Sequence, residues 1–151
     1  MTTIERKSVK KNLWTCPKCG RQFARQRQAH SCRPFLLEQH FEGKPVGELL
    51  YKKFKQAIRK KVGPFRVESL ECCIHFVNAT IFAAVKLFKD KIQLDFVLNH
   101  QIKNKGKRIH KYVPISVNRH VYYTAIRKEE DIDNEVLDWI QAALEWGNNL
   151  R

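Results

Sequence analysis

Three cysteines and one histidine near the start of the chain have the spacing of a metal site. They stand in WTCPKCGRQFARQRQAHSC as Cys-x2-Cys, ten residues, and then His-x-Cys. Thiolate sulfur and imidazole nitrogen are the ligands of structural zinc, which takes four of them in a tetrahedron. The spacing predicts one zinc ion bound by Cys16, Cys19, His30 and Cys32. Because all four ligands come from the protein, no position remains for water, and the zinc is expected to be structural.

A redox dithiol is the competing interpretation of Cys16 and Cys19. Such a pair needs a strand before it and a helix that opens at the first cysteine, and neither pattern is present. It would also leave His30 and Cys32 unexplained. A finger with two cysteines and two histidines is excluded, because no histidine follows Cys32 by three to five residues and His40 lies too far along the chain.

The elements that position these ligands are short. Pro17 and Gly20 belong to a tight knuckle turn that directs both sulfurs to one point, and Phe23 lies where a small finger needs an aromatic cover for its metal. Residues two apart on a helix point in very different directions, so His30 and Cys32 cannot both bind from regular helix. We expect a short helix over 24–29 that ends at His30, with Cys32 reaching back from irregular chain.

Length and charge limit the class of protein. The 151 residues allow one ordinary domain with a small module attached, and the net charge is +14. Residues 1–34 carry nine basic residues and one acid, residues 101–128 carry eight basic residues and none, and residues 129–151 carry seven acids and one arginine. This distribution fits either a nucleic-acid surface or plain solubility. No apolar run of membrane-spanning length and no secretory signal is seen, and five cysteines favour reduced thiols in the cytoplasm.

The pattern of apolar residues predicts an α+β chain. We expect a mobile basic tail over 1–12, the zinc-binding module over 13–34, a linker over 35–45 and a helix–meander–helix domain over 46–151. The first helix of that domain has an apolar stripe and ends at Gly63 and Pro64. The stripe consists of Val46, Leu49, Leu50, Phe54, Ala57, Ile58 and Val62. A basic amphipathic helix can lie on a membrane, but here a full domain follows to bury the stripe.

An antiparallel meander of about five strands is expected next, and then a last helix. The candidate strands are 65–69, 72–77, 81–88, 92–98 and, within 113–126, best 120–126. Cys72 and Cys73 would face opposite sides of their strand as small packing residues. The acids from Glu129 to Asp133 suit the start of the last helix, which ends at Gly147, Asn148 and Asn149.

Basic side chains suggest where DNA or RNA would bind. The 99–111 loop is long and rich in lysine, and tyrosines nearby suit base stacking as well as a sheet. The candidate nucleic-acid ligands are Lys18, Arg21, Arg25, Arg27, Lys103, Lys105, Lys107, Arg108 and Lys111. The leading hypothesis is a non-enzymatic nucleic-acid-binding accessory protein, in which the zinc module, the lysine-rich face of the first helix and the 101–111 loop hold phosphates. The acidic last helix would, if near, pair with the loop and mask it.

Two alternatives stay open. One is a protein-interaction or adaptor domain that uses the sheet face or the acidic helix. The other is an enzyme with a pocket between the sheet and the 99–111 loop, using His100, His110 or His120. The sequence does not choose between a nucleic-acid partner and a protein partner, and it leaves the oligomeric state open.

Three stretches together resemble a bacterial family classified as a domain of unknown function (5655). They are WTCPKCGRQFARQRQAHSC, LLYKKFKQAIRKKVGPFRV and VNRHVYYTAIRKEEDIDNEVLDWIQAAL. This likeness covers nearly the whole chain and implies a zinc-knuckle N-terminus joined to a helix–sheet–helix domain. It implies no reaction and therefore no catalytic residue.

Overall fold

The α+β fold expected from the sequence is confirmed. The computed structural model describes residues 13–23, 25–30, 32, 35–103 and 106–149, so the tail expected over 1–12 lies outside the described residues. A small hairpin of β1 (Trp14–Thr15) and β2 (Gln22–Phe23) comes first, followed by helices α2 (Leu37–Phe41) and α3 (Pro45–Val62). The strands are β3 (Arg66–Ser69), β4 (Ile74–Val77), β5 (Ile81–Leu87), β6 (Ile92–Leu98), β7 (Ile109–Ser116) and β8 (Arg119–Ile126). A 3-10 turn (Glu129–Asp131) precedes helix α4 (Asn134–Asn148).

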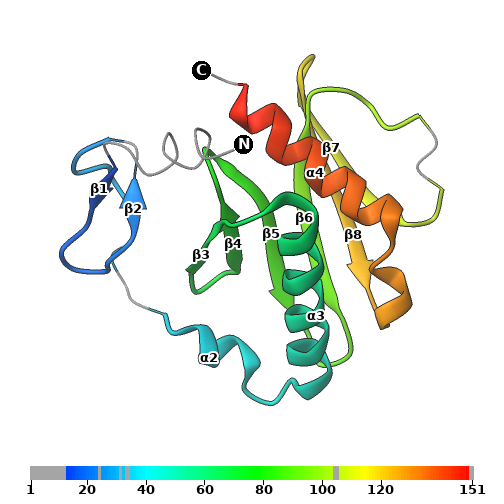
Figure 1. The fold of residues 1–151 in the computed structure, drawn as a ribbon, viewed down its shortest axis with the longest axis horizontal. Helices are drawn as coiled ribbons and strands as arrows, with labels where there is room; N and C mark the ends of the chain where they lie inside the picture. Colours follow the sequence, from blue (N-terminus) through cyan, green and yellow to red (C-terminus); the bar gives the residue numbers. More distant parts are fainter. Residues whose placement is uncertain (1–12, 24, 31, 33–34, 104–105, 150–151) are drawn as a thin grey trace.

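The six later strands form one antiparallel sheet in the order β3-β4-β5-β6-β8-β7. Strands β3 to β6 form a meander. After β6 the chain crosses to the edge of the sheet, where it forms β7, and then returns as β8 between β6 and β7. Figure 1 shows α3 and α4 side by side over one face of this sheet, with the β1–β2 hairpin beyond the β3 edge. The sheet and two helices thus form a two-layer domain that carries the small hairpin at its side.

The core lies between the sheet and the two helices. Ile92, Leu94, Phe96 and Leu98 of β6 are at most 2% exposed, which confirms the expected alternation along this strand. The turn before β6 is closed by a bond from the Phe88 N–H to the Lys91 carbonyl, so β5 and β6 are the expected hairpin. The helices contribute Leu50, Tyr51, Phe54, Ile58, Val136, Ile140 and Ala143 to the same cluster.

Helix α3 has a slightly different buried face from the one expected. Val46 and Leu49 are 45% and 54% exposed, so placing them in the buried stripe was wrong. Gly47 and Tyr51 face inward instead, since Gly47 packs against the Phe88 carbonyl and Tyr51 is 1% exposed. Gly63 ends the helix with a left-handed φ of 90°, as its position before Pro64 predicts.

Helix α4 begins where the acidic residues predict. The Asp133 carboxylate accepts a hydrogen bond of 3.2 Å from the Val136 N–H, which makes Asp133 the N-cap. Val136, Ile140 and Ala143 face the core, and Trp139 stacks on Phe96 with ring centroids 5.7 Å apart. The described residues contain no helix that is both long enough and apolar enough to cross a membrane.

Three local expectations need correction. Residues 35–45, expected to be a linker, contain α2, and Leu37 and Phe41 pack against the core. Strand β7 adds a sixth strand to the five expected; its side chains are mostly exposed, so no alternation marked it. Strand β4 starts at Ile74 rather than residue 72, which leaves Cys72 and Cys73 in the β3–β4 turn.

Candidate basic groove and metal centre

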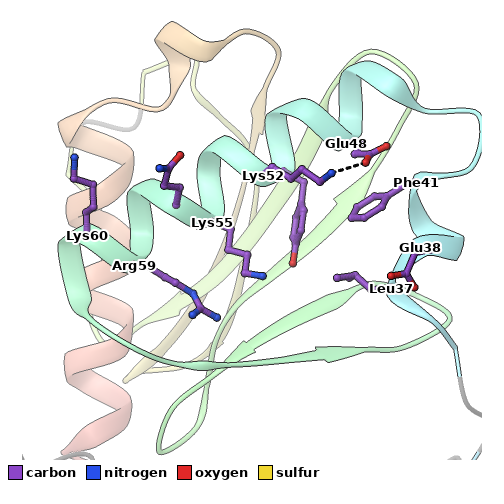
Figure 2. Close-up of a pocket in the computed structure, with 10 residues that line it drawn as sticks. Leu37, Glu38, Phe41, Glu48, Lys52, Lys55, Arg59 and Lys60 are labelled. Carbon is purple, nitrogen blue, oxygen red and sulfur yellow. Dashed lines mark hydrogen bonds and ion pairs between the residues drawn. The ribbon is translucent and has the colours of Figure 1, made fainter.

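A groove of about 750 Å³ runs along the outer side of α3, where α2 forms its other wall. Figure 2 shows Lys55 and Arg59 extending from α3 into the same space as Leu37 and Phe41 from α2. The groove therefore combines a partly apolar floor with a basic wall. Its lining consists of Leu37, Glu38, Phe41, Glu48, Tyr51, Lys52, Lys55, Gln56, Arg59 and Lys60.

The positive charge of this groove is only partly neutralised. Lys52 forms a salt bridge of 2.7 Å with Glu48, one helical turn away. Among the described residues, no acid forms a salt bridge with Lys55 or Lys60. Burial, helped by the charge of Arg59, lowers the pKa of Lys55. An anion beside a partly desolvated ammonium group stabilises its charged form, so this wall suits phosphate or carboxylate.

The arginine of the groove is held in place by the end of the helix. The Arg59 guanidinium lies 4.7 Å from the centre of the Phe65 ring and donates a hydrogen bond of 3.3 Å to the Phe65 carbonyl. These contacts hold the guanidinium in one position. Arg59 is nevertheless exposed and lines the groove. The groove thus has one positioned cation beside Lys55 and Lys60, which form no salt bridge with the described acids.

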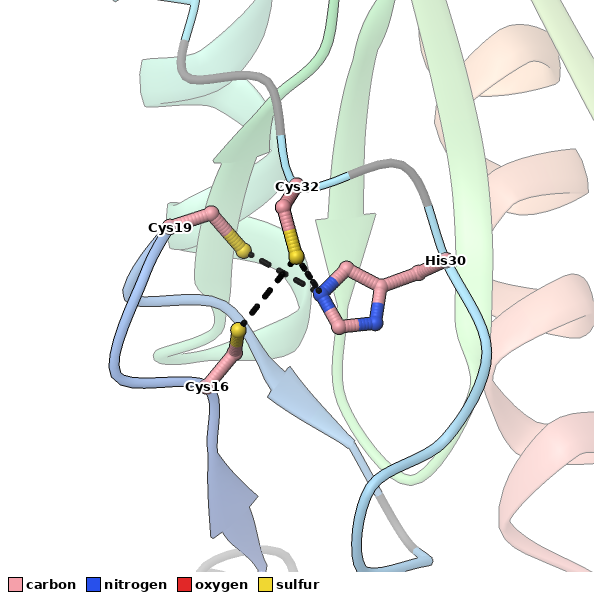
Figure 3. A group of neighbouring side chains, drawn as sticks. All are labelled: Cys16, Cys19, His30 and Cys32. Carbon is pink, nitrogen blue, oxygen red and sulfur yellow. Dashed lines mark hydrogen bonds between the residues drawn. The ribbon is translucent and has the colours of Figure 1, made fainter.

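The four residues expected to bind metal lie close together, beginning with the knuckle turn that carries Cys16 and Cys19. The Gly20 N–H bonds to the Cys16 carbonyl at 2.8 Å, and the Cys16 N–H bonds to the Arg21 carbonyl at 2.8 Å. Gly20 has a left-handed φ of 77°, which a residue without a Cβ adopts at little cost. The turn brings the Cys16 and Cys19 sulfurs to the same end of the β1–β2 hairpin, as Figure 3 shows.

His30 and Cys32 complete the group from irregular chain. The His30 Nε2 lies 3.4 Å from the Cys19 sulfur and 3.3 Å from the Cys32 sulfur, and the Cys16 and Cys32 sulfurs are 3.7 Å apart. The four ligand atoms all lie within 4.8 Å of one another, so the group can hold a metal ion. The short helix expected over 24–29 is wrong, because residues 25–27 form a turn and Arg27 has a left-handed φ of 54°.

The tautomer of His30 follows from its outer contact. The Nδ1 atom lies 2.5 Å from the Gln28 carbonyl, which can only accept a hydrogen bond, so Nδ1 carries the proton. The lone pair of Nε2 is then free and faces the three sulfurs. This arrangement, with a carbonyl fixing the far nitrogen of a metal-binding imidazole, is typical of metal sites.

Aromatic rings pack behind the ligands. Phe23 is 9% exposed, and its ring centroid lies 4.2 Å from that of His30 and 6.2 Å from that of Trp14. The Arg21 guanidinium covers Phe23 at 4.8 Å. Phe23 therefore shields the ligand group, in the role that its spacing from Cys19 predicted.

The thiols differ in their readiness to ionise. Hydrogen bonds from the Cys19 and Lys18 backbone N–H groups outweigh burial and lower the pKa of Cys16 to about 6. The neighbouring Cys16 sulfur and burial raise the pKa of Cys32. The backbone of the knuckle turn thus favours one thiolate, the form that binds metal.

The other candidate residues do not form one surface with the groove. Lys18, Arg25 and Arg27 are exposed on the metal-binding module, whereas Arg21 pairs with Glu68 of β3 at 3.8 Å. In the loop, Lys103 and Lys107 are exposed, and Lys105 lies outside the described residues. Arg108 is bound by acids of the α4 start, and the Lys111 ammonium lies over the Tyr123 ring at 4.9 Å.

The three histidines considered for catalysis are also separated in role. His100 and His110 are exposed, and the His100 Nδ1 atom lies 2.9 Å from the side-chain oxygen of Asn99. Both ring nitrogens of His120 are engaged, one by the Tyr112 hydroxyl and the other by the Val117 carbonyl. None of them lines the groove along α3.

Only the basic wall of the groove could be expected from the sequence. The lysine-rich face of α3 was expected to hold phosphates, but the apolar residues after 35 were assigned to a linker, so no second wall was expected beside it. Leu37 and Phe41 recur four residues apart, which is a helical spacing, so an amphipathic turn at this point was the available signal.

Fold and site define an α+β protein in which helices cover one face of an antiparallel sheet and a Cys3His group stands beside it. Residues 37–146 match the family model described as Domain of unknown function (DUF5655), and the chain belongs to that family. The match begins at α2, so it covers the helix–sheet–helix domain and not the metal-binding module. Neither a curated protein nor a solved structure matches the chain significantly.

Proposed function

We propose that this protein binds nucleic acid through the groove along α3, as a non-enzymatic accessory protein with a structural zinc ion. The observation that carries the proposal is the groove itself, with Lys55, Arg59 and Lys60 beside Leu37 and Phe41. Phosphates would contact the cations, and a base or sugar would lie on the apolar floor. Readout of base edges is not part of the proposal, so weak sequence specificity is expected.

Zinc is the metal that the donor set favours. Three sulfurs and one imidazole nitrogen match the Cys3His class of structural zinc sites, and harder ions prefer oxygen ligands. Cys16, Cys19, His30 and Cys32 would hold the ion, which would stabilise a module too small to form a core of its own. Four protein ligands leave no position for catalysis. Thiols in this role imply a reducing compartment such as the cytoplasm.

The metal-binding module is a second contact in this proposal. Lys18, Arg25 and Arg27 are exposed there and are free to contact phosphates outside the groove. Through the Arg21–Glu68 salt bridge the module stands against β3, whose chain follows directly from α3. The loop over 99–111 contributes less than the sequence suggested, because acids already hold Arg108.

The experiment is a salt series with the zinc-loaded full chain and mixed-sequence oligonucleotides of single-stranded DNA, duplex DNA and RNA. Fluorescence anisotropy should show binding at low salt that weakens as salt rises, with a slope of log K against log salt of about −0.7 per phosphate contact on single strands. No binding of any oligonucleotide at low salt would end this proposal.

A protein-interaction role is the alternative, and one observation favours it. Val46 and Leu49, one turn apart on α3, are 45% and 54% exposed, and Leu36 before α2 is 65% exposed. A partner that covers these side chains would be recovered with the tagged protein after nuclease treatment, and Leu49→Lys would abolish its recovery. A partner that nuclease removes would instead support the nucleic-acid proposal.

A further inference from the structure

The two cysteines outside the metal centre form a vicinal dithiol at the β3–β4 turn. The sulfurs of Cys72 and Cys73 are 3.0 Å apart. The turn that carries them is closed by a bond of 2.9 Å from the Leu70 N–H to the Cys73 carbonyl, and β3 pairs with β4 directly beyond it. The pair is therefore presented by a fixed turn between two paired strands.

The sequence suggested that Cys72 and Cys73 are small packing residues, but the structure does not bury them in that way. Cys72 is exposed and Cys73 is only partly buried, and both are free thiols. Neither sulfur reaches the four-residue metal group, which is the one group of histidine, cysteine and acidic ligands found in the described part of the chain. The pair offers two sulfurs without a third protein ligand.

Two sulfurs this close together restrict the ligand. Linear coordination, as for soft monovalent ions, places the sulfurs on opposite sides of the ion, and a tetrahedral zinc site needs further protein ligands. A trivalent pyramidal centre binds two sulfurs on the same side and carries its third substituent itself. Trivalent arsenic is such a centre, and it prefers soft sulfur to oxygen.

The protonation state also favours this chemistry over disulfide exchange. Burial, and then the adjacent sulfur and the charge of Asp95, raise the pKa of Cys73 to about 12. Disulfide exchange begins with attack by a thiolate, and the raised pKa makes Cys73 a poor attacking group at neutral pH. An arsenic(III) hydroxide needs no prior ionisation, because its leaving hydroxide takes up the thiol proton.

We propose that Cys72 and Cys73 form a binding site for trivalent organic arsenicals with two exchangeable oxygen ligands. In the reaction, R–As(OH)2 and the two thiols give two molecules of water and R–As(S)2, in which both sulfurs belong to the protein. Two As–O bonds and two S–H bonds break, two As–S bonds and two O–H bonds form, and arsenic stays trivalent. This site is separate from the groove and the metal centre, and it does not depend on the proposed nucleic-acid binding.

The probe is phenylarsine oxide, added to the zinc-loaded full chain. Trypsin cleavage after Arg66 and Lys86 releases residues 67–86, which contain Cys72 and Cys73 and no other cysteine. Mass spectrometry should find the phenylarsenic adduct on this peptide. It should survive excess monothiol and be reversed by a dithiol, since binding through two sulfurs raises retention by about 100-fold or more.

Single substitutions provide the controls. Cys72→Ser, at the exposed position, and Cys73→Ser should each remove monothiol-resistant retention on residues 67–86, and Cys72→Ser tests the claim even if Cys73→Ser fails to fold. Cys32→Ser should leave the 67–86 adduct unchanged. An unmodified 67–86 peptide in the wild-type protein, or a resistant adduct in Cys72→Ser, would overturn the proposal.

Discussion

One terminal guanidinium nitrogen of Arg108, Nη1, lies 2.8 Å from each carboxylate oxygen of Asp133, the residue that caps helix α4. The same nitrogen lies 3.1 Å from Glu135, and the other donates to the Asp131 carbonyl at 2.7 Å. The acidic start of α4 therefore holds the end of the basic loop. This contact holds the Arg108 guanidinium against α4 and away from a ligand, and it joins the start of β7 to α4.

Arg108→Ala should destabilise the fold by about 1 kcal/mol at neutral pH, because the pair is partly exposed and screened. Burial alone would raise the pKa of Asp133, but hydrogen bonds from Arg108 and the Val136 N–H hold that pKa below its usual value. Stability from a depressed carboxyl pKa is present above about pH 4 and is lost as pH falls through the folded-state pKa.

The measurement is urea unfolding of both proteins at neutral pH and at about pH 3. The difference between wild type and Arg108→Ala should shrink in acid. Lys107→Ala, next to it and exposed, should match the wild type at both pH values. A constant difference across the pH range would contradict the assigned role of Asp133.

Asp95→Asn should stabilise the protein at neutral pH. Asp95 lies on the sheet face away from the helices, in a row with His75, Ala84 and Tyr123, and burial raises its pKa to about 6. A raised pKa means that the folded state binds the proton more tightly than the unfolded state. Wild-type stability should therefore fall as pH rises from about 4 to about 6, and stay lower above it.

The expected gain from Asp95→Asn is about 1 to 3 kcal/mol at pH 7, decreasing to near zero below about pH 4. Urea unfolding across this range measures it. Asp90→Asn in the exposed β5–β6 turn is the matched control and should leave the pH profile unchanged. An Asp95→Asn profile parallel to that of the wild type would show that this carboxylate is not desolvated.

Gly47→Ala should destabilise the protein although alanine favours helix. A Cβ at Gly47 would collide with the Phe88 carbonyl, which belongs to the backbone and cannot rotate away. Overpacking of this kind costs about 1 to 3 kcal/mol, which exceeds the gain in helix propensity of about 1 kcal/mol. Thermal unfolding tests the prediction, with Val46→Ala as an exposed neighbour that should change little. A higher melting temperature for Gly47→Ala would refute the close approach.

Cys32→Ser should weaken zinc binding by more than about 100-fold, because even an outer partner of a ligand costs about 10- to 100-fold. Cys72→Ser, outside the ligand group, should bind zinc as the wild type does. Competition with a chromophoric chelator measures both. Circular dichroism should show that Cys32→Ser keeps the helix–sheet–helix domain folded. Full zinc affinity in Cys32→Ser would exclude it as the fourth ligand.

The parts of the fold that sequence predicted well are those with a strong local rule. The spacing of Cys16, Cys19, His30 and Cys32 reflects the geometry of the metal, and the alternation along β6 reflects burial on one face. Asp133 caps the start of helix α4, because carboxylates favour that end of a helix. In each case neighbouring residues carry the whole signal.

The features that were missed depend on contacts between distant segments. Strand β7 lies at the sheet edge, with Pro114 and mostly exposed side chains, so only its pairing with β8 defines it. Gly47 faces inward because it packs against the Phe88 carbonyl, which comes 41 residues later in the chain. The groove likewise exists only because α2 packs beside α3.

The central claim is that the groove along α3 binds nucleic-acid phosphates, and charge reversal tests it most directly. The double variant Lys55→Glu/Lys60→Glu changes the groove, and Lys103→Glu/Lys107→Glu makes the same change of charge in the exposed loop. In single-strand binding across a salt series, the groove variant should lose most of the affinity and about 0.7 of slope per lost contact. The loop variant should keep most of both. Equal losses in the two variants, or a larger loss in the loop variant, would contradict the assignment of the site to the groove.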